Sequence, residues 1–133
     1  MQLTTKARYA VMAMVDLVES DAPLSIQKIS EKQNLSQSYL EQLFLKLKKC
    51  GLVSSIRGAQ GGYILSQQPK DIKIYDVICA TDKPVKLTRC SSGKGCQSKS
   101  SKCKTHDLWA KLGLHMQDFL KNTSLEDVAK GAL

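Results

Sequence analysis

Residues 25–65 carry the clearest structural signals of the chain and read SIQKISEKQNLSQSYLEQLFLKLKKCGLVSSIRGAQGGYIL. Ser25 can cap a short helix that ends near Gln33-Asn34. A second helix begins near Ser36, with Ser38 as an alternative cap because Glu41 lies at capping-box spacing from it. The apolar stripe of this second helix consists of Leu40, Leu43, Phe44 and Leu47. Two short helices joined by a tight turn at residues 34–36 are typical of a helix-turn-helix.

A β-hairpin follows the second helix. Gly51 ends that helix, because glycine readily follows a helix C-terminus. Residues 52–56 and 63–65 have strand character, and the loop between them, 57–62, contains three glycines. The hairpin next to the helix pair predicts a winged helix-turn-helix with a small β-hairpin wing.

The flanking segments are predicted to be helical. A first helix covers residues 5–18, with Val11, Met14, Val15 and Val18 as its apolar stripe. A short helix covers 74–80, a long one starts near Thr105, and a last short helix, which Ser124 and Asp127 can cap, runs through Lys130. The expected fold class is therefore mainly α with a β-hairpin wing and a long C-terminal helix. That long helix has a wide apolar stripe, consisting of Leu108, Trp109, Leu112, Met116, Phe119 and Leu120.

Charge and composition indicate the partner and the compartment. The formal net charge is +8, which favours a polyanionic partner such as nucleic acid, whereas aromatic residues, at 5 %, are too few for a base-stacking surface. The longest apolar stretch, residues 9–15, is too short to span a membrane, and residues 1–9 do not resemble a signal peptide. We therefore expect a cytoplasmic protein with no membrane partner. Thiols stay reduced there, so the five cysteines are better interpreted as metal ligands or sensors than as disulfides.

The helix-turn-helix offers candidate contacts to double-stranded DNA. We expect the N-terminal part of the second helix of the pair to face the major groove, where Gln can contact adenine and Glu can accept from cytosine. Lys46, with Lys48 and Lys49, suits phosphate contacts, and Arg57 at the hairpin tip can enter a narrow minor groove. The predicted DNA-binding residues are Gln37, Ser38, Tyr39, Glu41, Gln42, Lys46, Arg57, Gly58 and Gly61.

A cysteine-containing loop, residues 82–104, separates the two halves of the chain, and we call it the cysteine segment. Cys90, Cys96, Cys103 and His106 lie within 17 residues, and thiolates with imidazole suit iron–sulfur clusters, zinc and copper(I). Six basic residues surround them and favour the thiolate form: Lys86, Arg89, Lys94, Lys99, Lys102 and Lys104.

Ligand type alone leaves a cluster, a zinc ion and a metal-free thiol sensor open. The spacing is looser than the CxxC pairs of zinc ribbons, which leaves room for a cluster. Cys50 and Cys79 stand outside the group and are expected to be small buried hydrophobes. There is no CxxC redox pair and no catalytic triad pattern, so we do not expect an enzyme; a zinc-stabilised interaction module is the alternative from another class.

The chain resembles the IscR-type family of iron–sulfur cluster regulators, which are small bacterial winged-helix proteins. The resemblance covers nearly the whole chain. It is carried by residues 3–11 (LTTKARYAV), 38–44 (SYLEQLF), 51–58 (GLVSSIRG) with 61–63 (GGY), 93–96 (GKGC) and 103–109 (CKTHDLW).

The resemblance implies a 2Fe–2S cluster held by Cys90, Cys96, Cys103 and His106, with 4Fe–4S or zinc as alternatives. It also implies a homodimer formed through the long helix, a near-palindromic DNA site, and control of cluster-assembly genes in contact with cluster assembly or donor machinery. Nitric-oxide-responsive and iron-responsive regulators belong to the same family.

One feature favours a branch of that family, and one departs from its usual pattern. Residues 1–9 contain no Asp or Glu, the ligand type that some relatives contribute there, and His106 is present, which favours the IscR-like branch. The gap between Cys96 and Cys103 is one residue longer than the usual pattern, and a loop tolerates such an insertion at little cost. We expect a DNA-binding domain at 1–81, a cluster-binding loop at 82–104, and a dimerisation helix with a short terminal helix at 105–133.

Overall fold

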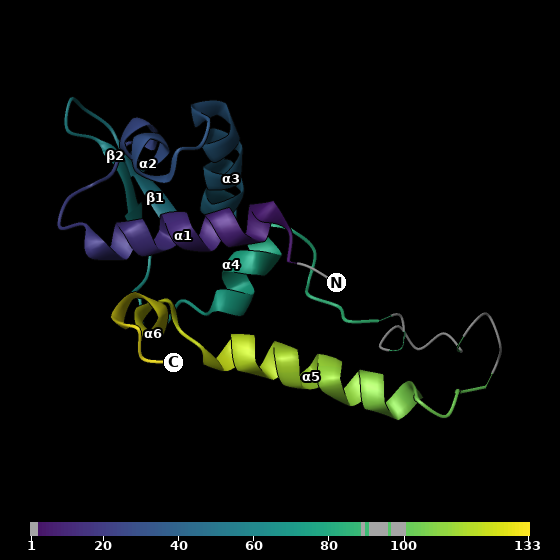
Figure 1. Ribbon diagram of the computed structural model, residues 1–133. Helices are drawn as coiled ribbons and strands as arrows, with labels where there is room; N and C mark the ends of the chain where they lie inside the picture. Colours follow the sequence, from purple (N-terminus) through teal and green to yellow (C-terminus); the bar gives the residue numbers. More distant parts are fainter. Residues whose placement is uncertain (1–2, 89, 91–95, 97–100) are drawn as a thin grey trace.

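The computed structural model describes residues 3–88, 90, 96 and 101–133. In this part of the chain the structure is mainly helical with one antiparallel hairpin (Figure 1), which confirms the expected fold class. The elements are α1 (Thr5–Glu19), α2 (Ile26–Gln33), α3 (Gln37–Lys49), β1 (Val53–Ile56), β2 (Gly62–Leu65), α4 (Ile74–Thr81), α5 (His106–Asn122) and α6 (Leu125–Lys130).

Side-chain caps fix the turn between α2 and α3. The Ser25 hydroxyl accepts from the Lys28 amide at 3.2 Å, and the Ser36 hydroxyl accepts from the Tyr39 amide at 3.2 Å. Of the two candidate caps for α3, the chain therefore uses Ser36. Asn34 ends α2 in the left-handed region, with φ of 54°, which asparagine tolerates better than most residues. The predicted helix-turn-helix is present.

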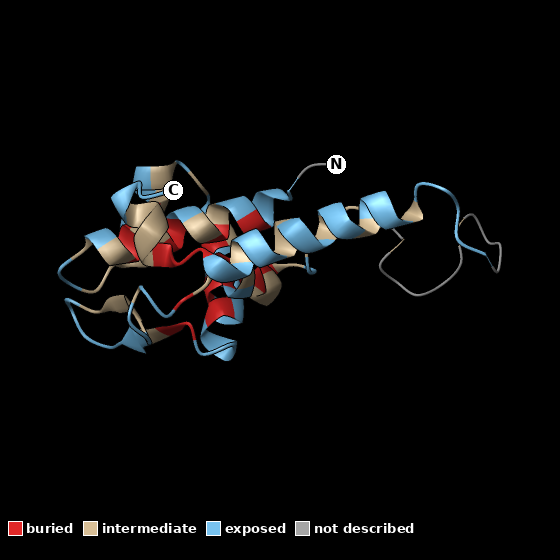
Figure 2. Ribbon diagram, turned by 90° about the horizontal axis from the view of Figure 1, so that it is seen from below, coloured by how far each residue is buried: buried red, intermediate tan, exposed pale blue. Residues whose placement is uncertain are grey.

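The core lies where α1 meets the other helices (Figure 2). The predicted stripe of α3 is correct, since Leu40, Leu43, Phe44 and Leu47 are all buried. The predicted stripe of α1 is only partly correct: Met14 is buried, but its three valines are half-buried. The buried face of α1 consists instead of Ala7, Ala10, Ala13, Met14 and Leu17. Alanine has only a methyl side chain, so this face admits close packing against its neighbours.

One buried carboxylate joins α1 to α2. Asp16 is 4 % exposed and accepts a hydrogen bond from the Gln33 side-chain amide at 2.6 Å. Lys32 completes the contact, with its Nζ 2.6 Å from the second carboxylate oxygen. Because a buried charge is tolerated when it is paired and hydrogen-bonded, this contact sets how α2 lies on α1.

The wing is attached to the helix-turn-helix by backbone hydrogen bonds. Val53 pairs with Leu65 and Ile56 with Gly62 in the hairpin register. Beyond the hairpin, Leu24 and Tyr63 exchange backbone hydrogen bonds of 3.1 and 2.7 Å, so the residues that precede α2 extend the sheet. The Tyr63 ring also packs on Phe44 of α3, with ring centroids 4.7 Å apart. Wing, α2 and α3 therefore form one unit.

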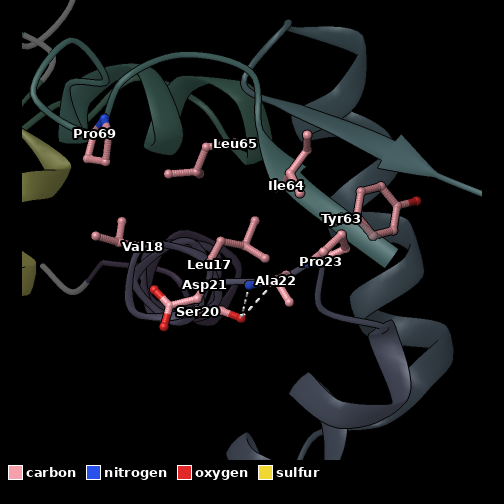
Figure 3. Close-up of a pocket in the computed structure, with 10 residues that line it drawn as sticks. All are labelled: Leu17, Val18, Ser20, Asp21, Ala22, Pro23, Tyr63, Ile64, Leu65 and Pro69. Carbon is pink, nitrogen blue, oxygen red and sulfur yellow. Dashed lines mark hydrogen bonds between the residues drawn. The ribbon is translucent and has the colours of Figure 1, made fainter. Parts of the chain in front are cut away.

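The wing also approaches the C-terminal end of α1. Figure 3 shows Ile64 and Leu65 of β2 opposite Leu17, with Pro23 and Tyr63 at one side of a shallow pocket of about 190 Å³. The Ser20 hydroxyl donates to the Ala22 carbonyl at 2.6 Å and so shapes the turn after α1. The apolar side chains of Ile64 and Leu65, opposite Leu17, hold the wing against the core.

Helix α5 extends away from the body of the molecule (Figures 1 and 2). None of its 17 residues is buried. Of the predicted dimerisation residues, Leu108, Trp109, Leu112 and Phe119 are exposed, at 58, 39, 41 and 59 %, whereas Met116 and Leu120 are half-buried. The apolar stripe expected from the sequence is thus largely open in this chain.

The wing attachment predicts a large penalty for a side chain at Gly62. A Cβ there would lie 2.4 Å from the backbone carbonyl of Leu24, and its φ of +158° already disfavours other residues. We expect Gly62→Ala to lower the free energy of unfolding by about 3 kcal/mol, from strain and overlap together. Urea unfolding followed by circular dichroism measures this loss.

Gly51→Ala is the matched control, because Gly51 also has positive φ (+74°) but nothing lies within 4 Å of its added Cβ. That variant should lose only about 1 kcal/mol, the cost of the left-handed conformation. Equal losses in the two variants would contradict the close approach of the wing to Leu24.

Candidate DNA interface and metal centre

The predicted base-reading side chains lie on one exposed part of α3. Gln37, Ser38, Glu41 and Gln42 are all exposed near its N-terminal end. Tyr39 differs from them, because it is half-buried and packs edge-on against Tyr9 with ring centroids 6.2 Å apart. Burial is the largest cause that raises the pKa of Tyr39, and the charges of the nearby Tyr9 and Asp82 raise it further. Tyr39 therefore holds α3 against α1, while its polar neighbours face solvent.

Two of the three α3 lysines already have partners inside the protein. Lys46 donates from Nζ to the carbonyl of Thr81 at 3.5 Å, at the C-terminal end of α4. Lys48 donates to the hydroxyl of Ser55 in β1 at 2.7 Å. The partner of Lys46 lies 35 residues away in the chain and that of Lys48 lies seven residues away, and spacing alone gave no sign of either. These lysines connect α3 to α4 and to the wing.

The wing tip combines an exposed cation with a tight glycine turn. Arg57 and Gly58 are exposed. The Gly61 amide donates to the Gly58 carbonyl at 3.0 Å, and a Cβ on Gly61 would lie 2.2 Å from the Ile56 carbonyl oxygen. The two glycines therefore shape the turn that presents Arg57.

Three of the four predicted metal ligands lie together. The ligand atoms of Cys90, Cys96 and His106 are all within 4.8 Å of one another, and each residue is half-buried. Nδ1 of His106 is 3.1 Å from the Cys96 sulfur. Because His106 is the first residue of α5, the site lies where the cysteine segment meets the long helix.

Cys103, the fourth predicted ligand, is exposed and lies outside this group of three. Its carbonyl accepts the His106 amide at 3.1 Å, and its sulfur is 3.6 Å from the Thr105 hydroxyl. A hydrogen bond from the Thr105 hydroxyl, and a second from the Cys96 thiol, lower the pKa of Cys103. The Cys103 thiol therefore adjoins the group and is the thiol favoured to ionise.

The Cys96 thiol has the opposite tendency. A backbone hydrogen bond from Cys103 favours its thiolate, but desolvation and the nearby thiols of Cys103 and Cys90 outweigh that effect and raise its pKa. Closely spaced thiols resist simultaneous ionisation. A cation bound among them relieves this repulsion, and soft donors of this kind suit iron–sulfur clusters and zinc.

The basic residues around the ligands are only partly described. Lys86, Lys102 and Lys104 are exposed, and Lys102 lies 3.8 Å from the Asp107 carboxylate. The other three predicted cations, Arg89, Lys94 and Lys99, lie outside the described residues, as do the glycines at 93 and 95.

The two remaining cysteines differ from expectation. Cys50 is exposed, so its prediction as a buried hydrophobe is wrong: it caps the C-terminus of α3, beyond the last core residue of that helix, Leu47. Cys79 of α4 is half-buried, and burial raises its pKa.

Among the described residues, no helix is both long and apolar enough to cross a bilayer.

Comparison with known proteins gives consistent results. The family model Rrf2, described as an iron-dependent transcriptional regulator, matches residues 3–131. A curated relative from Xenorhabdus nematophila, named HTH-type transcriptional regulator IscR, is 46 % identical over 132 residues, which are 98 % of this chain and 80 % of that protein.

Solved structures share the fold across the whole chain. IscR of T. potens has a TM-score of 0.79 and 37 % identity, covering 100 % of this chain and 89 % of that one. CymR of B. subtilis, the global cysteine regulator, has a TM-score of 0.84 and 32 % identity, covering 98 % and 97 %. These relatives are named regulators and not enzymes, in agreement with the sequence. This chain belongs to the Rrf2 family of iron-dependent transcriptional regulators and is a DNA-binding regulator.

Proposed function

We propose that this regulator senses an iron–sulfur cluster held by Cys90, Cys96, Cys103 and His106. The observation that carries the proposal is the convergence of two thiols and an imidazole within 4.8 Å, at the start of α5. Three thiolates and one imidazole fit a 2Fe–2S cluster. The name of the IscR relatives supports this cofactor, and by the same resemblance the regulated genes are those of cluster assembly, with the cluster donor machinery as a partner in the cytoplasm.

Each ligand has a definite part in this proposal. Cys90 and Cys96 supply thiolates from the cysteine segment, and His106 supplies a neutral nitrogen from a fixed helix position. Cys103 completes the set by turning its thiol from Thr105 toward Cys96, its other hydrogen-bond partner. A cluster with one histidine ligand supplies a redox-active centre of raised potential. In this proposal the chain has three parts: a DNA-binding domain at residues 1–81, a cluster-binding loop at 82–104 and a dimerisation segment at 105–133.

The DNA-reading unit consists of α3 and the wing. Gln37, Ser38, Glu41 and Gln42 contact base edges in the major groove, and Arg57 enters the minor groove, with Gly58 and Gly61 letting the backbone approach. Tyr39 supports α3 from behind, and Lys46 is shared between Thr81 and phosphate. Two such units in a dimer read a near-palindromic site.

The metal proposal predicts a brown protein after anaerobic purification. We expect iron and sulfide in equal amounts, with visible absorbance that is lost in Cys96→Ala and in Cys103→Ala, because each removes a ligand. Iron, sulfide and zinc analysis with a visible spectrum measures this.

Cys50→Ala is the matched control, since it removes an exposed thiol from the end of α3, outside the site, and should keep the cluster. A colourless anaerobic protein with one zinc per chain would refute the proposal and favour the zinc-stabilised alternative. Unchanged iron content in Cys103→Ala would remove Cys103 from the ligand set.

The DNA proposal predicts separable roles for the wing and α3. Arg57→Ala should weaken binding about tenfold on a duplex selected from a random pool by the parent protein, because a groove contact is lost. Glu41→Ala should retain affinity but change which sequences are selected, because it removes a base-reading acceptor. Fluorescence anisotropy and repeated selection measure the two effects.

Two exposed charges elsewhere provide controls: Lys70→Ala and Asp71→Ala, both in the turn before α4. Both should match the parent in affinity and in selected sequence. If Arg57→Ala and Glu41→Ala behave like these controls, the assignment of the reading unit is wrong.

The dimer proposal rests on the open face of α5. Leu108, Leu112 and Phe119 recur at spacings of four and seven, so they lie on one side of the helix. We expect Phe119→Asp to yield a monomer by sedimentation velocity, because it would place a charge in an apolar interface. Leu114→Asp is the matched control: Leu114 is equally exposed, at 58 %, but lies two residues after Leu112, on the opposite side. Dissociation of both variants, or of neither, would contradict this interface.

A further inference from the structure

The residues that lead from α4 toward Cys90, together with Thr81 at the end of α4, contact three other helices. We call residues 82–86 the strap. The Thr4 hydroxyl, at the N-cap of α1, donates to the Asp82 carboxylate. At the other end, the side-chain amide of Gln117 in α5 donates to the Val85 carbonyl at 3.2 Å. Immediately before the strap, Lys46 of the recognition helix α3 donates to the Thr81 carbonyl at 3.5 Å.

The start of the strap is firmly anchored. Thr81 is 2 % exposed, and its hydroxyl donates to the Val77 carbonyl at 3.1 Å. The Asp82 amide donates to the Ile78 carbonyl at 2.9 Å, so the strap leaves α4 in a fixed direction. Displacement of Asp82 therefore also displaces the carbonyl that Lys46 contacts.

The remainder of the strap lies over a pocket of about 250 Å³, which Ala7 of α1, Ile78 of α4 and Met116 of α5 help to line. The core therefore leaves space beneath the strap. Cys90 is the fourth residue after Lys86. Each residue spans at most about 3.6 Å. A movement of Cys90 beyond the reach of the chain between Lys86 and Cys90 must therefore also move the strap.

Electrostatics also connect Asp82 with α3. The Thr4 hydroxyl, the Lys83 amide and the cations of Lys6 and Lys46 lower the pKa of Asp82, so the carboxylate is charged near neutral pH. Its charge also contributes to the raised pKa of Tyr39, in the first turn of α3. One carboxylate thus acts on side chains near both ends of the recognition helix.

We propose that Asp82 is a positioning residue for the recognition helix, and that the strap transmits the state of the Cys90 site to α3. The second half rests on the proposed metal function, whereas the first half does not. Asp82 contacts no DNA in this scheme. It holds the end of α4, and through Lys46 it sets how α3 lies relative to α4.

The first test uses the metal-free protein and changes Thr4 in two ways. Thr4→Asp keeps an N-cap for α1 but replaces the hydroxyl donor with a carboxylate that repels Asp82. Thr4→Ser keeps both the cap and the donor. We expect Thr4→Asp to lower discrimination between the selected duplex and a scrambled one by about threefold or more, and to speed hydrogen exchange in α3, while Thr4→Ser matches the parent.

The second test changes the charge of Asp82 and compares loaded with metal-free protein. Asp82→Asn should leave iron content unchanged but bring the ratio of loaded to metal-free DNA affinity closer to one by about threefold or more. Asp71→Asn, the same change at an exposed turn residue, should leave the ratio as in the parent. A purely structural role would lower thermal stability without changing this ratio.

The outcomes separate the two proposals. If Thr4→Asp matches Thr4→Ser in discrimination and in exchange, the positioning role of Asp82 is wrong. If the parent loads iron but binds DNA equally in both states, transmission through the strap is wrong and the metal centre stands. A parent that takes up no iron overturns both the metal function and the transmission, and the metal-free test still decides the positioning role.

Discussion

Close packing against the small-residue face of α1 holds the helices and the wing in place. Ala10, Ala13 and Met14 are fully buried, and α1 contacts α2, α3, α4, α6 and β2. Because interiors are packed as densely as organic crystals, a larger side chain at these alanines would have to displace a neighbouring element. Polar contacts add to this packing: Asp16 fixes α2, and Thr4, at the N-cap of α1, reaches the strap. The DNA-reading unit and the cysteine segment are therefore both positioned by contacts with α1.

Much of the fold could be predicted because its signals are local. A cap acts within three residues, so Ser25 and Ser124 could be recognised from the sequence, and the periodic stripe of α3 gave its buried face. The face of α1 was harder, because valines and alanines occur around much of that helix and apolar periodicity gives weight to the larger side chains. The packing surface is the alanine side, which only the neighbouring helices determine. Cys50 illustrates the same limit, since its exposure depends on where α3 ends.

The candidate site, like the fold, could be predicted from the sequence only in part. Ligand type and spacing are properties of the sequence, and they predicted the residues of which three converge within 4.8 Å. The position of Cys103, outside that group, depends on a local hydrogen bond with Thr105 that spacing does not encode. The partners of Lys46 and Lys48 lie 35 and 7 residues away in the chain, so their roles in joining α3 to α4 and the wing could be found only in three dimensions.

The exposure of α5 connects the proposed dimer with the proposed metal site. None of the 17 residues of α5 is buried, and most helical stability in proteins comes from packing of an apolar face rather than from helix propensity. A second chain that covered Leu112 and Phe119 would stabilise α5 along its length, including its first residue, His106. Ordering of His106 in turn favours the assembled ligand set. By thermodynamic linkage the effect is reciprocal, so a metal bound at the start of α5 would strengthen the dimer by the same factor by which the dimer strengthens metal binding.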